Sequence, residues 1–274
     1  MTRAFFLIFL FSVSVRIFAA EETSTTTGNE SRTDSKGDSK QEVPPNLQKA
    51  IDNLKLPGVE INLRQWCVDV DSRVCLTRGM LELIACTKGT KEHESIFAVD
   101  AKPSHIHTAL LLLSARAGNP ASQQIIEEGV RRIVSIPPSG SPVQVFVVQK
   151  DTAGQEIERP VSDFIVEAEE QRIGGKNQPE KAFPTHTFLF AGSVLIGEGT
   201  GPRHYLCDTS GHVLSIATFG DELLCLPGIH DSANGALVWS ANGEKLPKVG
   251  TIVTLRLRPD VKKEVPAALP PLNP

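Results

Sequence analysis

Three side chains in the middle of the chain combine residue types and spacing that suit a metal site. His93 and Glu94 are adjacent, and His107 follows on the far side of one predicted strand. A catalytic zinc typically takes three nitrogen or carboxylate ligands and keeps a water in the fourth position. We therefore treat His93, Glu94 and His107 as a candidate site for a divalent metal. The alternative is that these side chains only hydrogen-bond the backbone around them.

Five cysteines offer a second chemistry. Cys67 and Cys75 are placed symmetrically about Asp71, so a hairpin turning at Asp71-Ser72 would bring them opposite each other as disulfide candidates. An odd count leaves at least one thiol free. No two cysteines lie closer than eight residues, which does not support an iron–sulfur cluster, because cluster ligands usually come in C-x₂-C runs. Two other disulfide pairings stay open: Cys75–Cys86 and Cys207–Cys225.

No complete catalytic motif accompanies these residues. The metalloprotease pattern HExxH fails at Phe97, the GxSxG elbow is absent, and the segment from Thr87 to Lys91 lacks the P-loop spacing. We therefore favour a non-catalytic envelope module that binds a partner or is structural, and we leave open whether the chain is an enzyme. The alternative is a metal-binding or redox protein that uses His93, Glu94 and His107.

The first twenty residues have the pattern of a secretory signal peptide. Arg3 precedes an apolar run from Ala4 to Val15, which is shorter than the ~20 residues needed to span a bilayer. The small pair Ala19-Ala20 then offers a cleavage site. We expect residues 1–20 to be removed and the mature protein to be periplasmic or secreted.

Composition divides the rest of the chain into a linker, one domain and a tail. Residues 21–45 are polar and are predicted to be a disordered linker, and residues 261–274 form a proline-rich, disordered tail. The domain between them covers residues 46–260. The net charge is −4 and the basic residues are dispersed, so we expect no nucleic-acid partner. No transmembrane span is expected after removal of the signal peptide, and an envelope or cell-surface protein is the expected partner.

The hydrophobic pattern of the domain is mainly that of strands bounded by turn residues. Asp71-Ser72, Asp151–Gly154 and Asp208–Gly211 are the predicted turns. The predicted strands are Ile61–Val70, Arg73–Thr77, Met80–Cys86, Ser95–Ala101, Gln144–Gln149, Glu156–Val161, Thr187–Ala191, His204–Cys207, His212–Thr218 and Thr251–Leu257.

One strong helix is predicted from Pro103 to Ala117, with Ser104 as its N-cap and an apolar face. A second helix is predicted from Asn119-Pro120 towards Val130. These elements predict an α+β fold: a largely antiparallel sheet packed with one buried helix. The DTxG pattern occurs in two of the turns, which raises the possibility of two similar sub-lobes.

The longest distinctive block is VCLTRGMLELIACTKGTKEHESIFAVDAKPSHIHTALLLL, and it resembles the signature block of the YdjY domain family. Further segments fit the same family: FLFAGS, HYLCD, DELLCLP and VGTIVTLRLRP. The similarity runs from about Gly58 to Pro259. It implies an exported bacterial protein, with a segment order most like planctomycete members. Some members are labelled ferredoxin-like, a description that the cysteine spacing here does not support.

Overall fold

A computed structural model describes residues 51, 53–126, 131–169, 181–197, 201–233 and 237–262. The predicted signal peptide (1–20), the linker (21–45) and nearly all of the tail (261–274) lie outside this part of the chain. Among the described residues, no helix has the length and apolar character needed to cross a bilayer.

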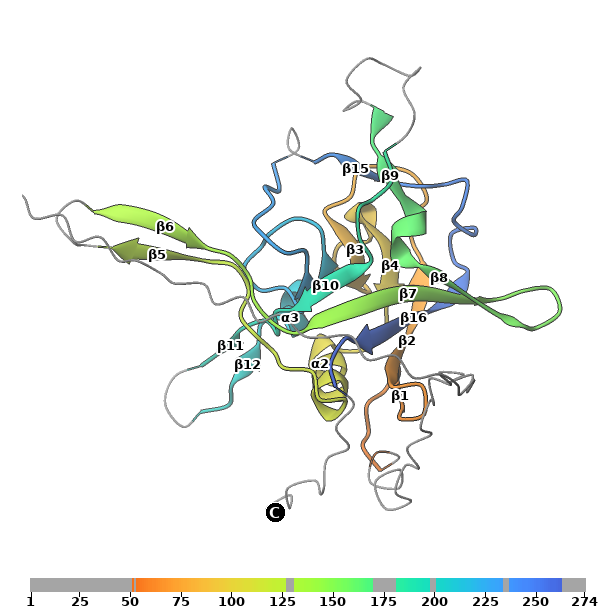
Figure 1. The fold of residues 1–274 in the computed structure, drawn as a ribbon, viewed down its shortest axis with the longest axis horizontal. Coiled ribbons are helices and arrows are strands. Elements are labelled where there is room, and N and C mark those ends of the chain that lie inside the picture. The colour runs from red at the N-terminus through yellow and green to blue at the C-terminus, as the bar shows by residue number, and fades with distance from the viewer. Residues whose placement is uncertain are drawn as a thin grey trace, which may run out of the picture. The chain divides into compact units, whose positions relative to one another are not determined.

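Eight strands form a closed barrel in which each strand is hydrogen-bonded to two neighbours (Figure 1). The order around the ring is β2–β16–β7–β10–β14–β13–β3–β4, and β4 closes the ring by pairing with β2. The bounds are β2 Cys67–Val74, β3 Leu83–Thr87, β4 Ser95–Val99, β7 Pro142–Lys150, β10 Thr187–Phe190, β13 His212–Ser215, β14 Leu224–Cys225 and β16 Ile252–Pro259.

The remaining described strands extend the barrel or form small hairpins beside it. β1 (Val59–Asn62) pairs with β2, and β8 (Glu156–Pro160) pairs with β7. Three separate two-stranded sheets are β5 with β6, β9 with β15, and β11 with β12. Their bounds are β5 Ser122–Ile126, β6 Arg132–Ile136, β9 Ile165–Glu167, β11 Leu195–Ile196, β12 His204–Tyr205 and β15 Trp239–Ala241. The helices are α2 Pro103–Leu112, α3 Cys207–Ser210 and the 3₁₀ turns η1 Glu92–Glu94 and η2 Val161–Phe164.

Two barrel pairs are parallel, β3 with β4 and β13 with β14, and the other barrel pairs are antiparallel. A parallel pair needs a connection that carries the chain back to the start of the next strand. Residues 88–94 and 216–223 are these two crossover segments. β16, the last strand in the sequence, lies between β2 and β7.

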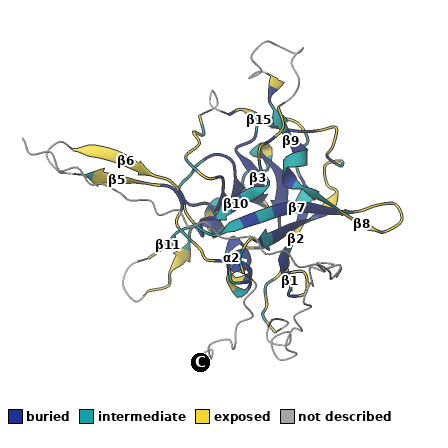
Figure 2. Ribbon diagram, in the orientation of Figure 1, coloured by how far each residue is buried: buried dark blue, intermediate teal, exposed yellow. Residues whose placement is uncertain are grey.

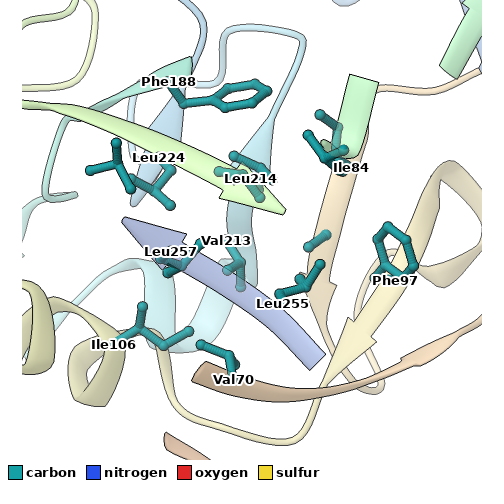
Figure 3. Packing of buried hydrophobic residues seen from close by; sticks show 14 of the residues in the cluster. Val70, Ile84, Phe97, Ile106, Phe188, Val213, Leu214, Leu224, Leu255 and Leu257 are labelled. Atoms are coloured by element: carbon teal, nitrogen blue, oxygen red, sulfur yellow. The ribbon is translucent and has the colours of Figure 1, made fainter. Parts of the chain in front are cut away.

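The barrel core follows from the two-residue alternation of its strands. Val68, Val70 and Val74 of β2 are buried together with Leu255 and Leu257 of β16. Figure 3 shows Val70, Leu255 and Leu257 close together, and Ile106 of α2 reaches the same cluster. The helix therefore contributes to the core and packs against β1, β2 and α3.

The predicted α+β class was wrong, because the chain forms an all-β barrel and α2 is the only described helix of more than four residues. A strand of two residues, such as β14, is too short to show the apolar–polar alternation by which a strand is recognised in a sequence. The predicted sub-lobes were also wrong. Asp151–Gly154 is a hairpin turn between β7 and β8, whereas Asp208–Ser210 lies in α3, and Gly211 ends that helix in a left-handed conformation.

The predicted turn at Asp71-Ser72 was wrong as well, since β2 runs straight through these residues. The chain instead turns after Asn62, whose Oδ1 accepts the backbone N–H groups of Arg64 and Gln65 at 3.1 and 2.9 Å. Such a side-chain acceptor stabilises a turn locally. Apolar residues occur on both sides of this turn, so the hydrophobic pattern did not reveal it.

The main predicted helix is confirmed in position but is shorter than expected. α2 begins at Pro103 and ends at Leu112, and its N-cap residue is Lys102 and not Ser104. The predicted second helix does not form. Its described residues contribute β5, so the β-branched pair Ile125-Ile126 indicated the structure better than the Asn-Pro start signal, and residues 127–130 lie outside the described part of the chain.

Candidate functional site

The two crossover segments meet beside β3 and β13. Lys91 Nζ of the first lies 4.9 Å from the ring centroid of Phe219 in the second. Gly211 leaves room for Thr90, because a Cβ on this glycine would lie 2.4 Å from the Thr90 hydroxyl oxygen. These contacts bring polar side chains from distant parts of the sequence together. We call the region formed by residues 88–94 and 216–223 with the adjoining β3 and β13 the crossover site.

His93 and Glu94 lie together in this site, on η1. His93 Nε2 is 3.1 Å from Glu94 Oε1, and the His93 side chain is 72% exposed. The other oxygen of Glu94 is 3.2 Å from Lys91 Nζ, which also contacts Glu82 at 2.9 Å. Lys91 therefore bridges two carboxylates, one of which was not singled out from the sequence.

The pKa values of Glu82 and Glu94 shift in opposite directions. Burial raises the pKa of Glu82, and its hydrogen bond with Glu94 raises it further. The same hydrogen bond lowers the pKa of Glu94. Glu82 therefore takes up a proton before Glu94 as the pH falls, and Lys91 contacts both carboxylates.

His107 has different partners. Its Nδ1 lies 2.8 Å from the Tyr205 hydroxyl, which donates to the carbonyl oxygen of Gly192 at 3.0 Å. The ring also packs edge-on against Phe190. Burial lowers the pKa of His107, so the imidazole is neutral near pH 7. This histidine fastens α2 to β12 and to the chain after β10.

The structure therefore brings His93 and Glu94 together and places His107 in a separate cluster. Within the described residues, no three His, Cys, Asp or Glu side chains are grouped so that they could hold a metal ion. The geometry gives no support to the predicted divalent-metal site.

All five cysteines are free, and four of them are buried. Cys67 begins β2 and Cys75 follows its end, so eight steps of ~3.3 Å separate them by about 26 Å, far beyond the ~7 Å Cα limit of a disulfide. The predicted Cys67–Cys75 bridge does not form. In the alternative pair, a hydrogen bond from the Cys75 thiol lowers the pKa of Cys86 to about 6 despite its burial.

A buried histidine–aspartate pair was not found from the sequence. His212 Nδ1 lies 2.5 Å from Asp221 Oδ1, and the histidine ring stacks on Phe219 at 4.1 Å. Burial raises the pKa of Asp221, but hydrogen bonding, chiefly with His212, outweighs burial and holds this pKa below its usual value. The only sequence signal was the polar doublet Asp221-Glu222 in an otherwise apolar stretch.

The crossover site contains parts of a catalytic centre without their usual connections. Cys86 is the ladder partner of His212, yet no hydrogen bond joins the two side chains in the described structure. A nucleophile is normally in hydrogen-bond contact with its base. Cys86 is also fully buried, so a substrate has no path to its sulfur. The described contacts are those of a packed polar cluster.

A cleft of about 570 Å³ lies beside the β9–β15 pair. Its lining includes Arg78, Met80, Ser240, Asn242 and Glu244. Small-molecule sites are lined predominantly by apolar and aromatic side chains, and this lining is mostly polar or charged. The cleft is therefore not the strongest candidate for a binding site.

The most unusual surface is the hairpin of β5 and β6, which we call the arm. Its register pairs Ile125 with Ile133 on one face and Gln124 with Val134 on the other. Large apolar side chains are exposed on both faces, and Ile133 is 65% exposed. Figure 2 shows β6 coloured as exposed. Exposed apolar clusters of this kind mark interaction surfaces. The sequence analysis predicted a helix over its first strand and no element over its second.

The model of the YdjY domain family matches residues 59–258, which is 200 of the 274 residues. No curated protein and no solved structure matches the chain. The matched range begins at β1 and ends within β16, so it includes the barrel and the arm. The function of the family is uncharacterised. The resemblance in the sequence is thus confirmed, and the chain belongs to the YdjY domain family.

Proposed function

We propose that this protein is an exported, non-catalytic binding module and that the arm is its binding element. The barrel holds the arm, and the arm contacts another protein in the periplasm or at the cell surface. The observation that carries the proposal is the exposure of apolar side chains on both faces of the arm.

A two-stranded hairpin is only marginally stable in water unless its apolar face packs against something else. Within the described residues, β5 and β6 pair only with each other, and Ile125, Ile133, Val134 and Ile136 stay exposed. A protein that encloses or extends the ribbon would remove these side chains from water. This gain supports a polypeptide partner.

The crossover site supports a binding role more than a catalytic one. Its one thiol with a lowered pKa is buried, and the His212 imidazole has no hydrogen bond to a thiol or hydroxyl among the described side chains. These groups are accounted for by hydrogen bonds and ring contacts within the barrel. Buried polar networks of this type help to specify a unique packed structure.

Site-specific photocrosslinking in intact cells tests the proposal. A photoreactive residue replaces exposed Ser135 on the arm, and a matched probe replaces exposed Thr251 beside β16. We expect the Ser135 probe to form one discrete adduct with an envelope polypeptide, identified by mass spectrometry, and the Thr251 probe to form none.

A second variant makes this result specific. Ile125→Thr with Ile133→Thr is expected to abolish the adduct while leaving the melting temperature unchanged, because these side chains bury little surface in the free protein. Ile252→Thr, at an equally exposed isoleucine outside the arm, is the control. Three outcomes would contradict the proposal. The two probes could give identical adducts, the adduct could survive the arm substitutions, or the probes could form adducts with lipid alone.

Export is tested on the same strain. We expect the mature protein in the envelope fraction to begin at Glu21, as shown by N-terminal sequencing. Full-length protein that begins at Met1 and remains in the cytosol would contradict export.

A further inference from the structure

We infer that the partner of the arm is a second copy of this chain, joined by antiparallel pairing of β6 with its counterpart. The inference rests on the proposed function, because it takes the arm as the binding element. It identifies the partner, the contacting strand and the symmetry of the contact.

The arm has unpaired strand edges. β5 and β6 form a two-stranded sheet, so the outer edge of each strand lacks a partner among the described residues. Exposed edges present a row of unpaired N–H and C=O groups that can accept another strand. Natural edge strands are usually protected by proline, lysine or a bulge. β6 (RIVSI) has no proline or lysine, and its register with β5 is regular.

The sequence of β6 suits pairing with itself. Two identical strands related by a two-fold axis must run antiparallel, and a pairing centred on Val134 places Val134 opposite its own copy. Ile133 then lies opposite Ser135 of the second copy, and Arg132 lies opposite Ile136. The central Val134 pair joins two β-branched side chains, and pairs of this kind stabilise a sheet. A strand with a charge at its centre would place like charges in contact, and β6 has none there.

Charge also permits this arrangement. The only charged residue within β6 is Arg132, at the end nearest the tip of the arm. Antiparallel pairing about Val134 separates the two Arg132 positions by four residues, or ~13 Å along the strands. This exceeds the ~8 Å screening length at physiological salt, so their repulsion is weak.

The paired arms would form a four-stranded sheet, above the size at which a sheet becomes stable on its own. On one face, the Ile125–Ile133 pairs of the two copies would lie diagonally across the symmetry axis, each Ile133 beside Ser135 of the second copy. On the other face, the two Val134 side chains would meet at the centre. The apolar residues on both faces of the arm thus acquire neighbours in a single assembly.

Molar mass in solution tests the inference. Light scattering of the intact protein over ~1–200 µM is expected to show a dimer. Val134→Lys places two ammonium groups opposite each other and is expected to raise the dimer dissociation constant roughly tenfold or more. Gln124→Lys is the matched control, because Gln124 is the partner of Val134 on β5 and carries the charge away from the axis. The control is expected to remain a dimer.

Charge complementation gives a second measurement. Val134→Glu alone is also expected to be monomeric, and an equimolar mixture of Val134→Glu and Val134→Lys is expected to restore the dimer. A monomeric wild-type protein, or a Val134→Lys variant that stays dimeric, would overturn the inference. If the wild type is monomeric and the Ser135 probe still captures a different envelope protein, the proposed function survives without this inference. If the probe also captures nothing, both fail.

Discussion

A carboxylate from α3 caps the N-terminus of α2. Asp208 accepts the backbone N–H of Ser104 at 2.8 Å and its hydroxyl at 2.7 Å, across 104 residues of sequence. The first N–H groups of a helix have no partner within the helix, so an acceptor at this position stabilises it. The carboxylate charge adds to this effect at the positive end of the helix.

We expect Asp208→Ala to lower the free energy of unfolding by about 1–2 kcal/mol, the usual cost of losing a helix cap. Urea denaturation measures this change. The control is Asp71→Ala, at an exposed position on β2, which is expected to change stability by less than about 0.5 kcal/mol. Equal effects of the two substitutions would show that Asp208 does not cap α2.

Glu158 on β8 gives stability that depends on pH. Its hydrogen bonds from Arg258 and Arg256 lower its pKa, although burial opposes them. A carboxyl with a lowered pKa stabilises the fold above its unfolded pKa of about 4.3, and this contribution is lost as the pH falls through the folded pKa. We therefore expect Glu158→Gln to lose less stability than the wild type below about pH 5.

Urea titrations at several pH values between about 3 and 7 check this prediction. Glu60→Gln, on the exposed side of β1, is expected to keep the pH dependence of the wild type. The same dependence in Glu158→Gln as in the wild type would contradict the assigned role of the Arg258 and Arg256 contacts.

Residue-level predictions from the sequence worked only over short range. His93 and Glu94 do lie together, because they are neighbours in one 3₁₀ turn. The partner of His107 is Tyr205, 98 residues away. The cap on Ser104 comes from Asp208. Contacts of this kind depend on the fold, so no local spacing could indicate them.

At the scale of elements, two glycines allow the arm to leave the barrel. Gly140 has a φ of +142°, and a Cβ there would lie 2.1 Å from the carbonyl oxygen of Phe190. A Cβ on Gly118 would similarly lie 2.2 Å from the carbonyl oxygen of Ser139. At the base of the arm, the backbone at each glycine therefore lies in close contact with the backbone of another segment.

We expect Gly140→Ala to lower the free energy of unfolding by about 3 kcal/mol, from backbone strain and overpacking together. Gly154→Ala is the matched control: Gly154 has a φ of +79° and no atom within 4 Å of the added Cβ. It is expected to cost only the strain, about 1 kcal/mol. Thermal and urea unfolding measure both variants, and equal losses would contradict the close packing at Phe190.

The elements that the sequence predicted well are those with long, regular patterns. The β7–β8 hairpin is confirmed because an Asp-x-x-Gly turn separates two clear strands. The segment from Ile61 to Thr77 was misread because hydrophobic residues continue across the real turn after Asn62. The arm was misread as a helix because Asn119-Pro120 resembles a helix start.

At the scale of the whole molecule, the arm and the barrel are separable. Ala117 and Gly140 are paired across the base of the arm, so residues 119–139 can be replaced by an Asn-Gly turn. We expect this variant to keep the far-UV circular dichroism of a β protein and a melting temperature within ~4 °C of the wild type. Loss of a cooperative transition would show that the arm is part of the folding unit.

The barrel itself could not be predicted from local patterns. Its closure depends on β2 pairing with both β16 and β4, and the first of these pairs joins residues about 180 positions apart. The sequence indicated most of the longer barrel strands. It carried no information on their order around a ring, so a closed barrel and an open sheet with a helix were indistinguishable.

The position of β16 has a consequence for how the protein is made. The ribosome releases the chain from its N-terminus, and residues 252–259 are the last to join the ring, where they complete hydrogen bonding to β2 and β7 at once. Until they emerge, the nascent polypeptide has a gap between these two strands and cannot reach its final state. The export proposed above would benefit from this delay, because a channel that threads extended polypeptide requires a substrate that has not completed folding. A stop codon before residue 252 should yield a product that proteases remove.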